Sequence, residues 1–184
     1  MASLRAACRR SRVEVWGHDQ ARRGLKPIVR KVWARRGQRP LAVSTHRYEW
    51  TYAYGFVHPQ SGKTHWLLMP EVSTEAMGLA LADFARAQRV GKHQRVVVVV
   101  DRAAWHTTPQ LPVPSGMHLL PLPAATPELQ PAERLWPLLN EGVANRSFPT
   151  IGTLERALAR RCRQLIAQRA LIRNLTCYHW WPDC

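Results

Sequence analysis

The stretch Val96-Val97-Val98-Val99-Val100-Asp101 is an unbroken run of five valines closed by an acid. A segment that is β-branched and apolar at every position is typical of a strand buried on both faces of a sheet. A helix is expected before this run, beginning at a capping Ser73 or Thr74 and ending at Gly91. Its apolar face has helical spacing and consists of Met77, Ala80, Leu81 and Phe84. After the run, a short strand is expected at His118–Leu120.

The remaining pattern adds strands on the N-terminal side and helices on the C-terminal side. A short strand is expected at 13–16, ending at His18 and Asp19, and two strands over 49–57 and 64–69 flank the turn 58–62 as an antiparallel hairpin. A leucine cluster predicts a helix that Pro137 kinks or delays, and Thr150 or Thr153 begins a long helix. The apolar positions of these two helices are Leu135, Leu138 and Leu139, then Leu154, Leu158, Leu165 and Ile166. This order predicts an α/β fold, a mixed sheet with flanking helices.

Size and composition indicate one domain with a real core. The chain has 184 residues, a mass of 21.0 kDa and 46% hydrophobic residues, which excludes wholesale disorder. No apolar run approaches the ~18–20 residues of a membrane span, and residues 1–12 are basic without the apolar core of a secretory signal. We therefore expect a basic N-terminal segment at 1–12, one folded domain at 13–184, and no membrane partner.

The charge is strongly one-sided. Lysine and arginine total 27 against 12 acids, giving a net charge of +15 and a pI near 11.1. This balance suits a polyanionic partner, because the arginine fork matches phosphate oxygens. A GC-rich genome is the alternative explanation for arginine over lysine, but it does not explain the shortage of acids. The cysteines Cys8, Cys162, Cys177 and Cys184 form no C-x-x-C pair, so neither a zinc module nor a disulfide framework is predicted, and we expect a reducing, cytoplasmic setting.

Three acidic residues lie in segments that open α/β sheets use for ligand binding, at the carboxyl ends of strands or in the loops nearby. Asp19 and Asp101 each follow a short apolar strand at its C-terminal end, and Glu133 begins a helix after a proline-rich loop. Brought together, they form an all-oxygen site suited to Mg²⁺ or Mn²⁺. Each also has an ordinary structural explanation, turn chemistry for the aspartates and the helix dipole for Glu133. Asp83 faces away from its helix's apolar stripe and is expected to be a solvated charge.

Three segments resemble conserved blocks of bacterial insertion-sequence transposases of the mariner-like group. The first segment runs from Trp16 to Leu25 and continues over Val32 to Pro40, the second runs from Val96 to His106, and the third from Leu122 to Trp136. The tail, Leu175 to Trp181, shows a weaker resemblance. The resemblance implies an RNase H-like fold and a DDE triad at Asp19, Asp101 and Glu133, which places a DDE catalytic domain at 13–184. Family members usually carry helix-turn-helix modules that read the transposon ends. We expect these modules to be absent here or encoded elsewhere, as in a split reading frame, a remnant or a fragment, with a separate helix-turn-helix chain as a candidate partner.

The sequence departs from that pattern beside each acid. Gln20 replaces an acid, Arg102 replaces an asparagine, Ala124-Ala125-Thr126 replaces Pro-Tyr-Ser, and Gln130 replaces an asparagine. Such neighbours orient the ligands, and their loss costs ~10–100-fold in metal affinity or activity. Arg102 either grips a phosphate or weakens metal binding, and the sequence leaves both open.

The function implied by the resemblance is DNA transposition. Two Mg²⁺ or Mn²⁺ ions would serve cleavage at the transposon end and attack of the freed 3′-OH on target DNA, with DNA as partner and a homo-oligomer forming on it in the bacterial nucleoid. The alternative is an inactive, truncated remnant that binds DNA non-specifically. An RNA-directed nuclease of the same fold is disfavoured because the blocks match transposases better. The basic residues expected to hold DNA are Arg22, Arg23, Lys26, Arg30, Lys31, Arg35, Arg36, Arg39 and Arg102, with a further group, Arg156, Arg160, Arg161 and Arg163, on the last helix.

Three ring side chains lie inside these blocks. His106, five residues after Asp101, fits a loop-fixing hydrogen bond better than catalysis. Trp105 and Trp136 are expected in the core rather than as stacking platforms for bases.

Overall fold

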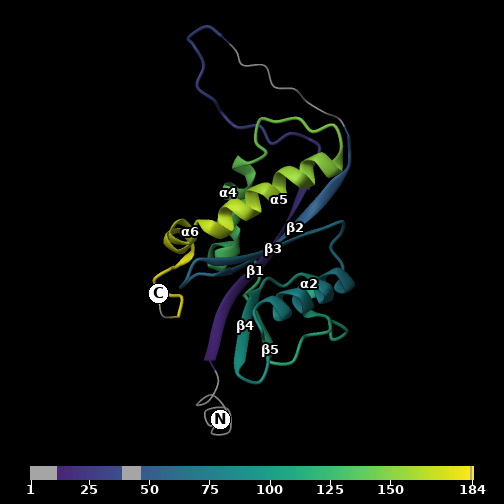
Figure 1. Cartoon of the computed structure of the whole chain (residues 1–184), viewed down its shortest axis with the longest axis vertical. Helices are drawn as coiled ribbons and strands as arrows, with labels where there is room; N and C mark the ends of the chain where they lie inside the picture. The colour runs from purple at the N-terminus through teal and green to yellow at the C-terminus, as the bar shows by residue number, and fades with distance from the viewer. Residues whose placement is uncertain (1–11, 39–46, 183) are drawn as a thin grey trace.

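A five-stranded sheet forms the centre of the computed structural model, which describes residues 12–38, 47–182 and 184 (Figure 1). The strands are β1 (Arg12–Gly24), β2 (Trp50–His58), β3 (Lys63–Met69), β4 (Gln94–Val100) and β5 (Met117–Pro121), in the order β3-β2-β1-β4-β5. The pairs β1–β2 and β2–β3 are antiparallel, whereas β1–β4 and β4–β5 are parallel. The expected mixed sheet is confirmed. The expected basic segment at 1–12 lies outside the described residues except for Arg12.

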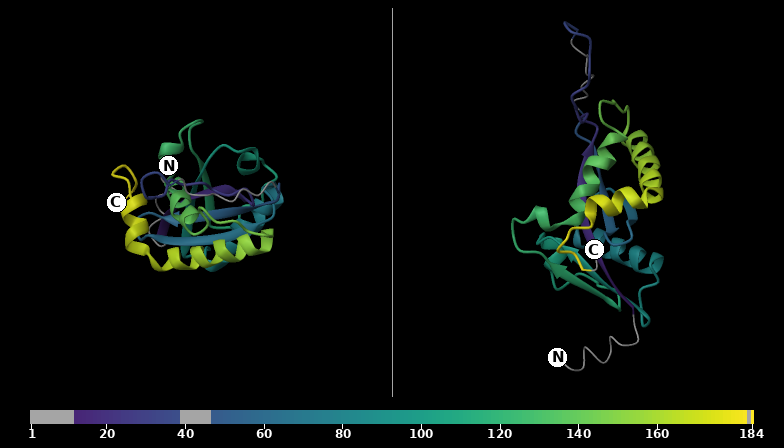
Figure 2. Two further views of the ribbon diagram at one scale, coloured as in Figure 1. Left: turned by 90° about the horizontal axis from the view of Figure 1, so that it is seen from above. Right: turned by 90° about the vertical axis from the view of Figure 1, so that its left-hand side faces the viewer.

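Helices cover both faces of the sheet. They are α2 (Thr74–Ala87), α3 (Ala104–Thr107), the 3₁₀ turns η1 (Pro127–Leu129) and η2 (Pro131–Arg134), α4 (Leu135–Glu141), α5 (Ile151–Ala167) and α6 (Arg169–Thr176). Alternation along β2 shows the two faces, because successive side chains of a strand point to opposite sides. Ala53 and Val57 pack with α4, α5 and α6, while Tyr54 and Phe56 pack with α2. Figure 2 shows α5 and α6 as a layer along one side of the sheet.

The local signals for helices and strands are largely confirmed. The hairpin forms, and Ser73 caps α2 by accepting a hydrogen bond from the Ala76 N–H. Thr150 caps α5. Pro137 falls in the first turn of α4, where its missing N–H costs no helical hydrogen bond. The helix before the valine run ends at Ala87, ahead of the expected Gly91.

Three other predictions were wrong. The first strand does not end at Asp19 but runs to Gly24, because β2 pairs with it over that whole length. Ile166, expected on the apolar stripe of α5, is 42% exposed. Asp83 is not merely solvated: His65 Nε2–H donates to its Oδ2 at 3.0 Å, and the Arg86 guanidinium bonds to its Oδ1.

Cys177 and Cys184 form a disulfide, which their spacing did not predict. Cys162 is a buried free thiol in α5. Within the described part of the chain, no helix is long and apolar enough to cross a membrane.

Candidate active site

Asp19 and Asp101 lie level with each other where β4 stops running beside β1. The parallel register pairs Gly17 with Val99 and ends there, so two more residues along each strand bring Asp19 next to Asp101. Asp19 is therefore in the middle of a strand rather than at its end. The prediction that Asp19 follows the end of its strand is therefore wrong, whereas Asp101 does follow the end of β4, and this end lies beside Asp19.

Gln130 anchors the third acid to the same place. Its side-chain Nε2–H donates to the carbonyl oxygens of His18 at 2.8 Å and Val99 at 3.3 Å, one on each of the two diverging strands. Gly17 makes room for this amide, since a Cβ there would lie 2.8 Å from Gln130 Oε1. The buried Gln130 caps η2, and this 3₁₀ turn carries Glu133 to the sheet edge.

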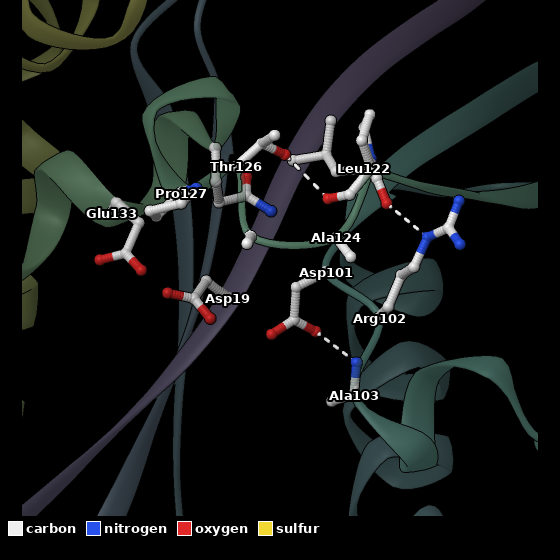
Figure 3. Close-up of a pocket in the computed structure, with 12 residues that line it drawn as sticks. Asp19, Asp101, Arg102, Ala103, Leu122, Ala124, Thr126, Pro127 and Glu133 are labelled. Atoms are coloured by element: carbon white, nitrogen blue, oxygen red, sulfur yellow. Dashed lines mark hydrogen bonds between the residues drawn. The ribbon is translucent and has the colours of Figure 1, made fainter.

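The three acids line one pocket of about 310 Å³. The loop 122–127 forms its opposite wall, and Thr126 Oγ1–H stabilises that loop by donating to the Pro123 carbonyl at 2.8 Å. Figure 3 shows the carboxyl groups following one another across the pocket, with Asp19 between Glu133 and Asp101. Segments separated by more than 30 residues in the chain thus supply one acidic cluster.

The Asp19 carboxylate is buried and held on both oxygens. Trp136 Nε1–H donates to Oδ2 at 2.7 Å, and the Gln20 backbone N–H donates to Oδ1 at 2.8 Å. Burial raises the pKa of Asp19 to about 6; the negative charges of Glu133 and Asp101 push in the same direction, against the Trp136 hydrogen bond. The three acids therefore concentrate negative charge at this edge of the sheet, with the Arg23 guanidinium beside Asp19 and Glu133.

Asp101 is more open and is oriented by its own loop. His106 Nδ1–H donates to Oδ1 at 2.5 Å, and the Ala103 N–H donates to the same oxygen at 3.0 Å. The His106 hydrogen bond lowers the pKa of Asp101, so this side chain stays ionised where Asp19 begins to protonate. His106 is itself buried, and its Nε2 lies 3.0 Å from Gln20 Oε1. As expected, it fixes the loop rather than facing the pocket.

His18 lies in the core directly beneath this network. Its ring stacks on Phe56 with centroids 4.1 Å apart, and its Nδ1–H donates to the Gly55 carbonyl at 3.1 Å. Complete burial, together with the nearby His106, lowers the pKa of His18 to about 3. His18 is therefore a neutral packing residue.

The basic residues predicted to hold DNA differ in their surroundings and exposure. Arg22 is exposed over the Trp50 ring, while Arg23 is half-buried beside Asp19 and Glu133. Lys26, Lys31, Arg35 and Arg36 lie on the segment after β1, which extends away from the body of the molecule (Figure 1). Arg30, on the same segment, is tied to α4 through the Pro137 carbonyl at 2.9 Å. Arg39 lies outside the described residues.

Arg102 faces away from the acids. Its Nε–H donates to the Leu122 carbonyl at 2.8 Å, and Figure 3 shows its guanidinium on the far side of Asp101 from Asp19. In this position it stabilises the pocket wall. On α5, Arg161 is occupied by Glu141 at 2.7 Å, whereas Arg156, Arg160 and Arg163 are exposed.

The acids match a divalent cation by chemistry and charge. Three carboxylates are the hard oxygen donors that Mg²⁺ and Mn²⁺ prefer. Burial is the main cause of the raised pKa of Asp19, and the charges of Glu133 and Asp101, which add to it, are ones that a cation would neutralise. The hydrogen bonds from His106 and Ala103 both reach Asp101 Oδ1, so neither of them occupies Oδ2. Over 12–38, 47–182 and 184, no three acidic, histidine or cysteine side chains are gathered closely enough to enclose a metal ion as they stand. The fit is therefore one of donor type, without a preformed cage.

Two supports of this site were not predicted from the sequence. Trp136 was expected only as a core residue, yet its N–H bonds to Asp19; its place three residues after Glu133, about one helical turn, was the available signal. Gln130 was noted as a departure from the family pattern, and its bridge between two strands had no signal in the local sequence.

Comparison with known proteins gives two findings from sequence. A profile of the family described as "DDE superfamily endonuclease" matches residues 14–155, which contain all three acids. The protein y4pE/y4sA of Sinorhizobium fredii (strain NBRC 101917 / NGR234), described as uncharacterized, is 40% identical over 100 residues, which is 54% of this chain and 73% of that protein.

Solved structures share the fold. The mariner Mos1 paired end complex with Mg matches with a TM-score of 0.59 at 20% identity, over 88% of this chain and 55% of that one. The paired end complex with Mn gives 0.55 at 18% identity over the same shares, and a pre-cleavage Mos1 transpososome gives 0.56 at 16% identity, over 91% and 57%. The chain thus spans a little over half the length of the Mos1 chains it resembles.

Proposed function

The chain belongs to the DDE superfamily of endonucleases, and from that premise we propose that it is a transposase catalytic domain, at 13–184, that cleaves DNA strands and transfers their 3′-OH ends. The observation that carries the proposal is the convergence of Asp19, Asp101 and Glu133 on one pocket. Each comes from a different segment, and β-sheet register together with the Gln130 anchor brings them to one edge.

Asp19, Asp101 and Glu133 are the residues proposed to hold Mg²⁺ or Mn²⁺, with two ions as the expected number. Such ions, when bound, activate the attacking oxygen and neutralise charge that develops on the phosphate. The chain's own residues keep the carboxylates in place: Trp136 and Gln20 hold Asp19, and His106 holds Asp101. The solved Mos1 complexes with Mg and with Mn support this choice of metal.

We propose DNA as the substrate and, with it, action at the bacterial nucleoid. Exposed lysine and arginine side chains on the segment after β1 and on α5 would contact the phosphate backbone of DNA. The net charge of +15 favours this contact whatever the base sequence of the DNA. The solved paired-end complex of Mos1 with a left transposon end supports DNA as the partner, and we propose that a homo-oligomer of this chain acts on it. Arg102 is proposed to act through the pocket wall rather than on phosphate, because its Nε–H bonds to Leu122.

The test compares nicking of supercoiled plasmid by the purified chain and two variants, with Mn²⁺ or Mg²⁺ present. Asp101→Asn removes a proposed ligand, whereas Asp83→Asn makes the same change on α2, where Asp83 pairs with His65 and Arg86 outside the pocket. We expect metal-dependent nicking by the wild type and by Asp83→Asn, and a loss of more than ~100-fold in Asp101→Asn with DNA affinity unchanged.

Two outcomes would overturn the proposal. Equal nicking by Asp101→Asn and wild type would show that this acid is not part of the active site. Binding of DNA without nicking by any of the three proteins would favour the alternative, a non-catalytic remnant that binds DNA non-specifically. Calorimetric titration with Mn²⁺ distinguishes the active domain from the non-catalytic remnant, since a working set of acids binds the ion in the absence of DNA.

A further inference from the structure

The indole of Trp136 contacts two charged side chains at once, the pocket acid Asp19 and the neighbouring Arg23. Its Nε1–H donates to Asp19 Oδ2 at 2.7 Å, and the Arg23 guanidinium lies 5.5 Å from the centre of its ring. Asp19 and Arg23 are four residues apart on β1 and therefore on the same face of the sheet. Trp136 is 8% exposed, so both contacts lie in largely dehydrated surroundings.

The neighbouring strand leaves space for this ring. Gly55 on β2 is the residue paired with Asp19, and a Cβ on it would lie 3.1 Å from Trp136 Cη2 and 3.3 Å from Trp66. These distances are shorter than ordinary contacts, so a side chain at this position would push the indole away from the carboxylate. Trp66 packs edge-on against Trp136 from β3, with ring centroids 6.1 Å apart. The space left by Gly55 thus lets the indole lie directly over the sheet.

We propose that Trp136 is a positioning residue of the active site, which fixes the Asp19 carboxylate through its N–H and seats the Arg23 guanidinium on its ring face. This inference rests on the proposed function. One rigid side chain then sets the separation between a carboxylate proposed to hold metal and the neighbouring guanidinium. Without the N–H, Asp19 keeps only the Gln20 backbone hydrogen bond and gains freedom to rotate away.

The Arg23 contact is the second half of this arrangement. The Arg23 Nη1–H donates to the Arg22 carbonyl at 2.8 Å, while its buried Nε–H has no acceptor among the described residues. Burial lowers the pKa of Arg23, and the charges of Asp19 and Glu133 oppose that change. Stacking on an indole face stabilises a guanidinium in such a position, because the ring face is negative.

The experiment compares Trp136→Phe with Trp66→Phe. Both variants lose one indole N–H from the same aromatic cluster, but the Trp66 N–H donates to Thr64 Oγ1 at 2.9 Å and does not touch Asp19. Phenylalanine keeps a ring for Arg23, so the first variant isolates the N–H. We expect Trp136→Phe to weaken Mn²⁺ binding by ~10–100-fold in calorimetric titration without DNA, with unchanged plasmid affinity. Its nicking should recover as Mn²⁺ is raised, which a folding defect would not allow. Trp66→Phe should match the wild type in all three measurements.

A spectroscopic signature adds a readout independent of activity. The indole N–H resonance missing from the spectrum of Trp136→Phe should shift when Mg²⁺ is added to the wild type, whereas the resonance missing from Trp66→Phe should not. If Trp136→Phe and Trp66→Phe bind Mn²⁺ equally well and the wild type still nicks DNA, the positioning role is wrong and the proposed function stands. If the wild type neither binds Mn²⁺ nor nicks DNA, the proposed function itself fails.

Discussion

Replacing Asp19 by asparagine should make the metal-free protein more stable at neutral pH while abolishing its activity. Burial raises the pKa of Asp19 from 3.8 to about 6. Since one pH unit corresponds to ~1.4 kcal/mol, ionising this carboxyl in the folded chain costs ~3 kcal/mol of unfolding free energy. The folded pKa is raised, so the cost is absent below the unfolded value and is complete once the pH passes the folded one.

Asparagine removes this cost but also changes one hydrogen bond. Its single oxygen can accept from either Trp136 Nε1–H or the Gln20 N–H, which now bond to different oxygens of Asp19. Losing one such bond costs ~1 kcal/mol. We therefore expect a net gain of ~2 kcal/mol above about pH 7, and no gain near pH 3, where both proteins are neutral at this position.

The assay is urea unfolding with EDTA at several pH values. Asp101→Asn is the control of opposite sign: because the His106 hydrogen bond lowers the pKa of Asp101, its ionised form stabilises the fold, and that stability is lost as the pH falls. Asp101→Asn should therefore be less stable than wild type at neutral pH. If the Asp19→Asn difference from wild type does not change between acid and neutral pH, Asp19 is not held in the buried, charge-repelling setting described here.

Two further predictions concern the anchor of Glu133 and the contact with DNA. Gln130→Ala leaves the buried carbonyl oxygens of His18 and Val99 without this donor, so thermal unfolding should show a loss of ~1–3 kcal/mol and nicking should fall, whereas Gln110→Ala on an exposed turn should change neither. The logarithm of DNA affinity should fall linearly with the logarithm of salt concentration, and replacing both Arg35 and Arg36 by alanine should reduce the slope by ~2 in fluorescence anisotropy; an unchanged slope would show that these two residues do not contact phosphate.

The strands and helices with strong local patterns could be predicted from the sequence because short-range physics controls them. Five consecutive valines favour extended backbone wherever they occur, and Ser73 and Thr150 cap helices through contacts within three residues. The order of the three acidic segments and their similarity to a known family also lie in the sequence itself. Together these features predicted the mixed sheet, the helices α2 and α5, and the identity of the three acids.

The active-site supports depend on pairings between distant segments, and only the tertiary structure decided them. The bonds from Trp136 to Asp19 and from Gln130 to His18 join residues more than 110 positions apart, and the register of β1 against β4 brings Asp19 level with Asp101. A strand's apolar pattern does not encode which neighbour it pairs with or where that neighbour ends. For the same reason the length of β1, the Cys177–Cys184 disulfide and the burial of His18 emerged only once the chain was folded, because each depends on what packs against it.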